Sequence, residues 1–313
     1  MKFLKKIIRH LVNFFLKFGG RFISDKNYYR LQYYVILGRF PNIDNPSLFT
    51  EKLQWLKLND HNPMYTKLVD KYEVKEYVSS IIGAQYVIPT LGVWDSPDEI
   101  EFDTLPDRFV LKTTFGGGCD GVIICRDKSS IDYGETILKL RKSFETNPYL
   151  RAREWPYKNV PHRIIAEKYM EDDSGELRDY KFYCFNGIPK VMLVASNRFS
   201  NHNFNYFDMD FNVLPITSAM GSQSDSCIEC PVCFEEMKAI AKKLAKDLTH
   251  VRVDLYCCQD KVYFGELTFY DSSGYDDLNS EEWNKKFGDW LPLPIKSDTV
   301  NKGLGCQGIE MFY

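Results

Sequence analysis

The segment VRVDLYCCQDKVYFGELTF, residues 251–269, constrains the fold more than any other part of the sequence. Apolar and polar residues alternate on both sides of a short polar stretch, the pattern of two antiparallel strands joined by a turn. If residues 259–261 form the turn, Asp254 lies opposite Glu266 and Arg252 lies opposite Thr268. Like charges placed directly opposite each other destabilise a strand pair, so the two facing carboxylates need a physical reason.

A bound hard cation is one such reason, because Mg²⁺ takes oxygen ligands from carboxylates and from substrate phosphates. The alternative is an exposed hairpin whose charges are screened by solvent. We favour a metal held between Asp254 and Glu266, provided that the assumed register is right.

A glycine-rich loop in FVLKTTFGGGCDGVIIC, residues 109–125, is the second chemical feature, with Lys112 just before it. Consecutive glycines let backbone N–H groups approach a polyphosphate closely, and a lysine adds a point charge. The loop joins two predicted strands and is not a Walker A sequence. A glycine-rich hairpin tip without a ligand is the alternative.

Two further predicted strands carry charged residues, one at its end and the other at alternate positions. IIAEKYM, residues 164–170, closes an apolar run with Glu167 and Lys168, which could bind the donor and acceptor edge of adenine. In DYKFY, residues 179–183, Asp179 and Lys181 lie on one face of a strand. Taken alone, the first motif favours a solvated strand end and the second favours a structural ion pair.

The remaining periodicity predicts a mixture of helices and antiparallel strands. A helix is expected from Pro63 to Gly83 and another over residues 234–248, and Asn186-Gly187 predicts the turn of a hairpin. Helices mixed with antiparallel hairpins indicate an α+β (mixed α/β) architecture.

Charge and cysteine content exclude some classes of protein. A formal net charge of −3 over 313 residues lacks the basic excess of a nucleic-acid binder, so we expect no nucleic-acid partner. Nine cysteines are an odd number, spread through a long chain, which favours reduced thiols in the cytosol over a disulfide framework. The cluster CIECPVC, residues 227–233, could begin a zinc site, but no second ligand pair follows it.

The first residues of the chain have a charge balance of their own. Six of the 40 basic residues precede Asp25, and no acidic residue does. The rest of the chain therefore has 34 basic and 43 acidic residues, a formal net charge of −9. Residues 3–18 place apolar side chains at spacings of three and four, with basic residues largely on the other side. This amphipathic helix either lies on an anionic membrane through residues 1–21 or packs on its own domain.

Taken together, these motifs resemble the ATP-grasp superfamily, in the order in which that family carries them. Four stretches are similar to its TupA-like branch, which is associated with bacterial surface-polysaccharide and teichuronopeptide synthesis. They are NPSLFTEKLQWLKL (45–58), YTKLVDKYEVKEYV (65–78), RDYKFYCFNG (178–187) and FGELTFYDSSGY (264–275). The similarity covers residues 45–291.

The resemblance implies roles for three sets of residues. The residues implied to contact ATP are Lys112, Gly116, Gly117, Gly118, Glu167, Lys168, Met170, Asp179 and Lys181. The residues implied to hold Mg²⁺, as two ions bridged by Glu266, are Asp254, Glu266 and Thr268. The residues implied to act on the phosphoryl group in transfer are Arg252, Lys181 and Lys112.

Two positions depart from the family pattern or leave it open. The superfamily commonly has Asn where Thr268 stands, and a hydroxyl is a weaker Mg²⁺ ligand, so the second metal ion is in doubt. Lys71 either reaches the site or forms a helix-surface ion pair with Asp70.

The fold implied by the resemblance is an ATP-grasp fold, two α+β subdomains gripping ATP after a helical N-terminal region. The expected segments are a basic amphipathic helix (1–22), a helical pre-ATP-grasp region (23–105), a small subdomain with the glycine-rich loop (106–172), a large subdomain with the metal site (173–295) and an irregular tail (296–313).

The reaction implied is ATP- and Mg²⁺-dependent amide formation, through an acyl phosphate, between a small amine or amino acid and a carboxylate of a glycan or lipid-linked glycan. Loops such as residues 271–277 would set specificity. The alternatives are a phosphotransferase that stops at a phosphorylated glycan, a nucleotide-sugar glycosyltransferase using Asp208-Met209-Asp210, and a non-catalytic scaffold. The expected location is the cytoplasm, at the inner face of the cell membrane.

Overall fold

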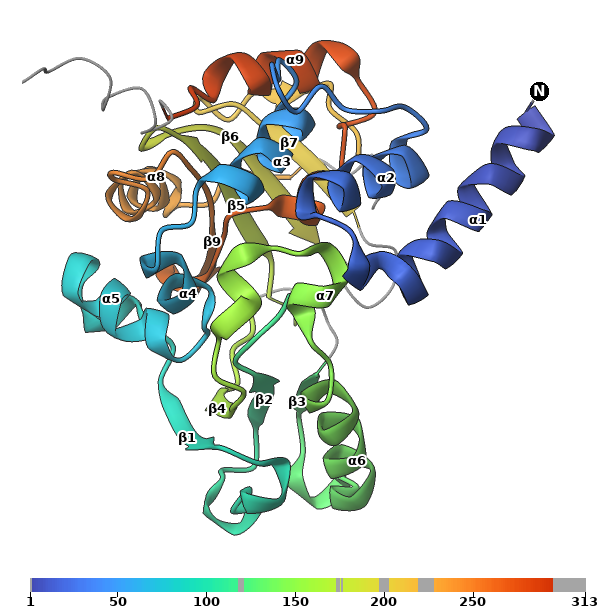
Figure 1. Ribbon diagram of the computed structural model, residues 1–313. Coiled ribbons are helices and arrows are strands. Elements are labelled where there is room, and N and C mark those ends of the chain that lie inside the picture. The colour runs from blue at the N-terminus through green and yellow to red at the C-terminus, as the bar shows by residue number, and fades with distance from the viewer. Residues whose placement is uncertain are drawn as a thin grey trace, which may run out of the picture.

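The computed structural model describes residues 2–117, 121–172, 175, 177–196, 203–218 and 228–294. Within these ranges the chain forms two antiparallel sheets with helices packed around them, the α+β class expected from the sequence (Figure 1). The α-helices are α1 (Lys2–Gly19), α2 (Asp25–Leu37), α3 (Phe49–Asn59), α4 (Met64–Val69), α5 (Glu73–Ile82), α6 (Tyr133–Phe144), α7 (Pro148–Ala152), α8 (Phe234–Leu244) and α9 (Glu281–Trp290). The strands are β1 (Thr90–Trp94), β2 (Phe109–Thr113), β3 (Val122–Cys125), β4 (Ile164–Lys168), β5 (Asp179–Phe185), β6 (Ile188–Ser196), β7 (Asn203–Phe207), β8 (Val213–Leu214), β9 (His250–Cys258) and β10 (Lys261–Thr268).

The smaller sheet has the strand order β1-β4-β2-β3, and every neighbouring pair is antiparallel. Its buried core is formed by side chains of β2, β4 and α6: Phe109, Leu111, Leu140, Ile164 and Ala166. Since side chains alternate along a strand, Val110 and Lys112 of β2 lie on the other face of the sheet. β1 is part of this sheet although it precedes residue 106, the expected start of the small subdomain.

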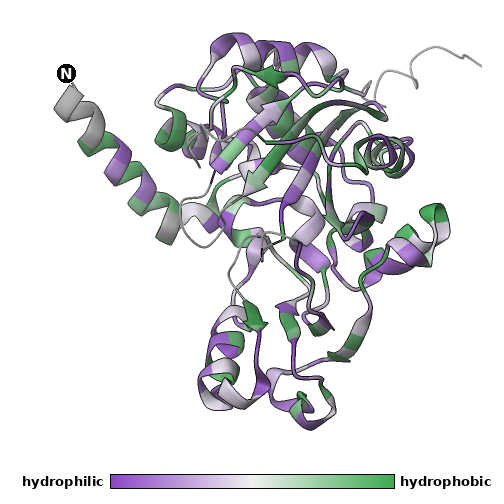
Figure 2. Ribbon diagram, turned by 180° about the vertical axis from the view of Figure 1, so that it is seen from behind, coloured by the Kyte–Doolittle hydropathy of each residue, from purple (hydrophilic) through white to green (hydrophobic). Residues whose placement is uncertain are grey.

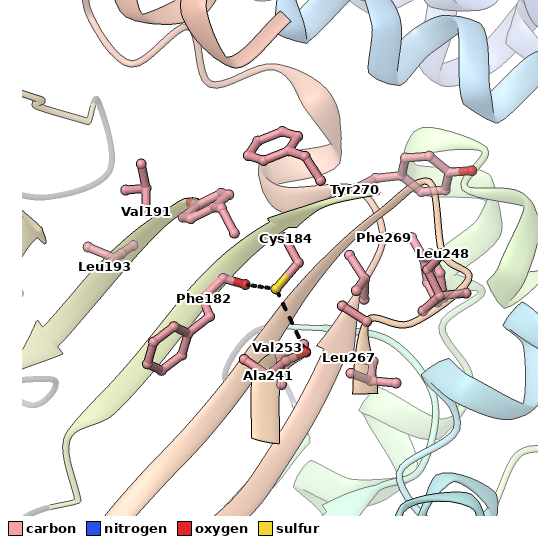
Figure 3. Close-up of a cluster of buried hydrophobic side chains, with 14 of the residues drawn as sticks. Phe182, Cys184, Val191, Leu193, Ala241, Leu248, Val253, Leu267, Phe269 and Tyr270 are labelled. Atoms are coloured by element: carbon pink, nitrogen blue, oxygen red, sulfur yellow. Dashed lines mark hydrogen bonds between the residues drawn. The ribbon is translucent and has the colours of Figure 1, made fainter. Parts of the chain in front are cut away.

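The larger sheet has the strand order β10-β9-β5-β6-β7-β8, and α8 packs on one of its faces. Apolar side chains from β5, β9 and β10, among them Phe182, Val253 and Leu267, gather there with Ala241 of α8 (Figure 3). The thiol of Cys184 donates to the carbonyl of Ala241 in α8, at 4.0 Å, and to that of Phe182, at 3.6 Å. Phe182 faces Val253 across β5 and β9. The alternating residues of these strands lie on the opposite face, where Tyr183 of β5 and Val191 and Leu193 of β6 are also buried.

Two tight turns join strands of the larger sheet. Asn186 and Gly187, with φ of 49° and 76°, connect β5 to β6, which confirms the predicted hairpin. Gln259 and Asp260, with φ of 51° and 56°, connect β9 to β10. The predicted turn over residues 259–261 is wrong, because Lys261 already pairs with Cys258.

A bulge at Gly265 restores the pairing that the sequence predicted. β10 pairs regularly up to Phe264 and again from Glu266, with the register shifting between them. Without the extra residue, Asp254 would face residue 265 and Glu266 would point into the core. With it, Asp254 lies opposite Glu266, and Arg252 lies opposite Thr268. The predicted opposition of the two carboxylates is therefore confirmed.

The single helix predicted from Pro63 to Gly83 is wrong, because the chain forms two helices there, α4 and α5. The buried carboxylate of Asp70 accepts hydrogen bonds from the backbone N–H groups of Tyr72, at 2.8 Å, and Glu73, at 3.2 Å. An aspartate that binds nearby backbone in this way competes with helical hydrogen bonding. The hydrogen bonds of the Asp70 side chain therefore explain the break between α4 and α5.

One pair of cysteines departs from the expectation of reduced thiols. Cys233, just before α8, and Cys257 on β9 form a disulfide, with Cα atoms 6.8 Å apart. The expectation is therefore wrong for this pair. Cys227, the first cysteine of the CIECPVC cluster, lies outside the described residues.

The bulge predicts that glycine is preferred at residue 265. A Cβ atom there would lie 3.0 Å from the carbonyl oxygen of Asp254 and 3.0 Å from the ring of Tyr256. Gly265→Ala should lower the free energy of unfolding by about 1–3 kcal/mol, the usual effect of overpacking. Urea denaturation measures this change.

Gly134→Ala, in α6, is the matched control, since its nearest neighbour is the Asp132 carboxylate at 3.3 Å. It should shift the free energy of unfolding by less than about 1 kcal/mol. Equal stability of Gly265→Ala and the wild type would contradict the steric requirement.

Candidate active site

The polar residues of the larger sheet converge on the face opposite α8, in what we call the charged row. Lys181 on β5 lies opposite Asp254 on β9, and Asp254 lies opposite Glu266 on β10. Two residues along, Arg252 on β9 lies opposite Thr268 on β10. Residues opposite each other in paired strands point to the same side, so these five side chains meet on one face.

The buried guanidinium of Arg252 joins the members of the charged row. Its Nε and Nη2 atoms donate to the two carboxylate oxygens of Asp254, both at 2.7 Å, in a bidentate pair. Nη2 also lies 3.2 Å from the hydroxyl of Thr268 and 3.4 Å from Oε1 of Glu266. Because one cation contacts both carboxylates, it offsets the repulsion between them.

Lys181 adds a second cation to the charged row. Its Nζ atom forms an ion pair with Asp254 and lies 3.7 Å from Oδ1 of Asp179. The structure therefore brings together four of the residues predicted to serve the nucleotide and the metal: Asp179, Lys181, Asp254 and Glu266.

Asp271 is a site residue that was not assigned from the sequence. It begins the single-turn helix η7 (Asp271–Gly274) directly after β10. Its carboxylate forms an ion pair with Arg252 and accepts a hydrogen bond from the hydroxyl of Tyr183 at 2.6 Å. Its sequence signal is its position three residues after Thr268, inside a segment expected to set specificity.

A pocket adjoins the charged row, lined by four of the residues predicted to contact the nucleotide: Lys112, Glu167, Lys168 and Met170. Val110 and Ile124 line it from the smaller sheet, and Tyr256 lines it from β9 of the larger sheet. Tyr256 follows Asp254 by two residues, so it points to the same face as the charged row. An apolar slot with a few polar groups at its edge suits a flat heteroaromatic base.

Two lysines surround the buried carboxylate of Glu167 in this pocket. Lys112 Nζ lies 2.6 Å from one oxygen and Lys75 Nζ lies 2.5 Å from the other. Burial alone would raise the pKa of Glu167, but Lys112 and Lys75 outweigh it and hold the pKa at about 2. Glu167 is therefore ionised at neutral pH and can only accept hydrogen bonds. Lys75, on α5, was not assigned from the sequence.

Lys71 reaches the glycine-rich loop because the helix breaks before it. Its backbone N–H donates to the carbonyl of Thr114 at 2.9 Å, and its Nζ donates to that of Gly116 at 2.5 Å. The alternative of an ion pair with Asp70 is wrong, since Asp70 pairs with Arg163 at 2.9 Å. Burial lowers the pKa of Lys71, so an incoming anion would stabilise its charged form.

The donor set around Glu266 fits Mg²⁺ bound together with a phosphate. Burial alone would raise the pKa of Glu266, but Lys71, Lys181 and Arg252 hold it at about 2, so the carboxylate is ionised. Among the described residues no group of three or more His, Cys, Asp and Glu side chains is placed to hold a metal. Asp254, Glu266 and Thr268 nevertheless supply only oxygen atoms, which is the set Mg²⁺ uses when phosphate and water complete its shell.

Two of the predicted features are not part of the site that the structure describes. Gly118 is outside the described residues, whereas Gly116 and Gly117 are described. The carboxylate of Asp208 accepts hydrogen bonds from the backbone N–H groups of Asp210, at 2.9 Å, and Asn212, at 2.8 Å. The Asp208-Met209-Asp210 motif therefore stabilises the turn between β7 and β8.

Comparison with protein families supports the resemblance seen in the sequence. The family model described as TupA-like ATPgrasp matches residues 51–292, well over half of the chain. This range includes the charged row, the pocket and Lys71. A comparison with curated proteins finds no significant match.

Solved structures resemble the chain at low identity. The D-alanine–D-alanine ligase of Bacillus anthracis, complexed with ATP, is 17% identical, with a TM-score of 0.44, over 73% of this chain and 65% of that chain. The D-cycloserine synthetase DcsG is 18% identical, with a TM-score of 0.41, over 73% of this chain and 71% of that chain. The ATP-grasp ligase PsnB, complexed with a minimal precursor, is 12% identical, with a TM-score of 0.38, over 67% and 55%. This chain thus spans 65% of the length of the first ligase, and these likenesses carry no inference about activity.

The lysine pair around Glu167 predicts a pH-dependent stability. Glu167→Gln leaves two half-buried amines without their shared carboxylate, so it should lower the free energy of unfolding by about 3 kcal/mol at neutral pH. Because the folded pKa of about 2 lies below the unfolded value, this stabilisation is lost as pH falls. The difference between wild type and variant, measured by urea denaturation, should therefore shrink below about pH 4.

Glu171→Gln is the matched control, since Glu171 pairs with Arg108 at the surface. It should change the free energy of unfolding by less than about 1 kcal/mol. A difference between Glu167→Gln and the wild type that stays constant from neutral to acidic pH would contradict the ion-pair account.

Proposed function

We propose, from the premise that this chain belongs to the TupA-like ATP-grasp family, that it is an ATP-dependent ligase that joins a carboxylate to an amine. The observation that carries the proposal is the position of the pocket beside the charged row, since Tyr256 of the pocket and Asp254 of the charged row share one face of β9. Glu167, Lys168 and Met170 line the pocket, and Asp254 and Glu266 belong to the charged row beside it. A nucleotide has the same division into a flat apolar base and a charged tail.

Four cations of this site would bind the polyphosphate tail. Lys112 lines the pocket, Lys71 contacts the glycine-rich loop, and Lys181 and Arg252 belong to the charged row. In the structure each of these four side chains contacts a carboxylate or a carbonyl of the protein itself. A polyphosphate would replace such partners with more highly charged oxygen atoms, which strengthens each contact.

Asp254, Glu266 and Thr268 are the residues that would hold Mg²⁺. When bound, the ion supplies charge neutralisation for phosphate oxygens in phosphoryl transfer. Arg252 contacts all three of these residues, so it fixes their positions relative to one another. Its guanidinium is also placed to stabilise negative charge on a transferring phosphoryl group.

The proposed reaction has two steps. An acceptor carboxylate oxygen attacks the γ-phosphorus of ATP, the bond to ADP breaks, and an acyl phosphate forms. The amine then attacks the acyl carbon, phosphate leaves, and the amine nitrogen loses a proton. These steps need positioning and charge stabilisation rather than a covalent nucleophile, which agrees with a site built from lysine, arginine and carboxylates.

We take the acceptor to be a bacterial surface polysaccharide or its lipid-linked precursor. The support is the association of the TupA-like branch with surface-polysaccharide and teichuronopeptide synthesis. The second substrate is then a small amine or an amino acid.

The reaction is tested by measuring ADP release from Mg-ATP with an acidic glycan, with and without a panel of amines. ADP release that needs both substrates, with labelled amine recovered in the glycan, supports the ligase. A stable phosphorylated glycan formed without amine contradicts it in favour of a phosphotransferase. Protection against unfolding by UDP-sugars but not by Mg-ATP contradicts the nucleotide assignment.

Glu266→Gln should abolish turnover, with ADP release lowered at least about a hundredfold, because it removes a charged metal ligand. The fold should persist with some loss of stability, since Lys71, Lys181 and Arg252 stabilise the ionised carboxylate of Glu266, and urea denaturation checks that the variant is folded. Glu235→Gln, an exposed position on α8, is the control and should retain wild-type turnover. Normal ADP release from Glu266→Gln would refute the metal assignment.

A further inference from the structure

α1 contacts its own domain through one side only. The guanidinium of Arg9 donates to the carbonyls of Val35, at 2.6 Å, and Ile36, at 2.9 Å, at the end of α2. On the same side Leu16 is buried and Val12 packs against the main core. Spacings of three and four residues place Arg9, Val12 and Leu16 along one helix face.

The opposite side of α1 carries exposed apolar residues, which we call the apolar stripe. Its members are Ile7, Ile8, Leu11, Phe14, Phe15 and Phe18. At about 100° per residue, Leu11 and Phe18 point away from the side that holds Arg9 and Leu16. Leu11, Phe14 and Phe18 expose 64%, 65% and 61% of their surface. Figure 2 shows α1 extending from the body with hydrophobic residues along it.

This arrangement opposes the alternative that α1 buries its apolar face on its own domain. Single exposed apolar residues are ordinary, but a continuous row on one helix marks an interaction site. The side of α1 that carries Arg9 contacts the domain instead, and the apolar stripe is exposed.

The charge of the first 24 residues indicates which kind of partner the apolar stripe binds. Lys2, Lys5, Lys6, Arg9, Lys17 and Arg21 are the charged residues before Asp25, and no acidic residue is among them. A second copy of the chain docking through the same stripe would bring two such basic segments together, and the repulsion would oppose association. An anionic lipid surface complements both properties, since its headgroups attract the basic residues and its acyl region accepts the apolar ones.

We propose that α1 is a membrane-binding helix that lies in the surface of an anionic bilayer, with the apolar stripe among the lipids. None of the described helices is long and apolar enough to pass through a bilayer, so α1 would lie in its plane. Phe22 in the following turn is also exposed and lies beneath the guanidinium of Arg21, 4.7 Å from its ring centroid, which extends the surface by one more turn.

The base of α1 is fixed to the part of the molecule that carries the glycine-rich loop. Arg153, directly after α7, donates to the carbonyl of Gly20 at 2.6 Å and to Asp25 at 2.5 Å. α7 packs beside the loop, where a Cβ atom at Gly116 would lie 3.1 Å from Pro148. α1 and the glycine-rich loop are therefore both held by contacts with the segment of α7, which lies at the base of α1 in Figure 1. One consequence, which rests on the proposed function, is that a lipid-linked acceptor would reach the site from the same surface.

The membrane proposal is tested by co-sedimentation of the full chain with vesicles, without any catalytic readout. Vesicles of phosphatidylcholine with about one third phosphatidylglycerol should bind the wild type, and raising the salt concentration should weaken binding. Leu11→Glu together with Phe14→Glu should reduce the bound fraction at least about tenfold, because two charges enter the apolar stripe.

Leu138→Glu is the matched control, since Leu138 on α6 is 62% exposed and lies on another part of the molecule. It should bind vesicles like the wild type. Failure of the wild type to bind anionic vesicles, or equal losses in the α1 and Leu138 variants, would overturn the proposal. A wild-type dimer in sedimentation equilibrium that Leu11→Glu with Phe14→Glu converts to monomer, without vesicle binding, would assign the stripe to a second copy instead.

Discussion

The site depends on the guanidinium of Arg252, which contacts Asp254, Glu266, Thr268 and Asp271. Two carboxylates facing each other across a strand pair would be destabilising without a cation. Arg252 supplies that cation from within the sheet, and Lys181 adds a second. The folded chain can therefore hold the ionised carboxylate of Glu266 close to that of Asp254 before any metal or phosphate arrives, which is the preorganisation that phosphoryl transfer requires.

Two local irregularities of the backbone place charged side chains in the site. The bulge at Gly265 turns Glu266 from the core face of the larger sheet to the face of Asp254. The break between α4 and α5, held by Asp70, turns Lys71 toward Gly116. Bulges and helix breaks disturb regular hydrogen bonding, so they persist where neighbouring contacts fix them. Here each one places a single charged side chain at the junction of the two sheets.

Period-two alternation and an Asn-Gly turn were enough to predict the two hairpins and the opposition of Asp254 to Glu266. The pairing of β5 with β9, which brings Lys181 to the charged row, has no local signal in the sequence. The sequence was not enough for the bulge, although the apolar positions shift parity from Val262 and Phe264 to Leu267 and Phe269 across it. The predicted turn was one residue too long, which cancelled the missing bulge. Lys71 stayed undecided because its role depends on Asp70 breaking an otherwise helical pattern. Lys75 resembles any helix-surface lysine, and only the packing of α5 against Glu167 distinguishes it.

The central claim is that Asp254 and Glu266 form a metal site beside a nucleotide pocket. Anomalous diffraction from crystals grown with Mn²⁺ and a non-hydrolysable ATP analogue tests it most directly, since Mn²⁺ shares the oxygen ligands of Mg²⁺. The account predicts an anomalous peak between the carboxylates of Asp254 and Glu266, with the base in the pocket lined by Glu167 and Met170. A peak elsewhere, or a nucleotide bound away from that pocket, would contradict it.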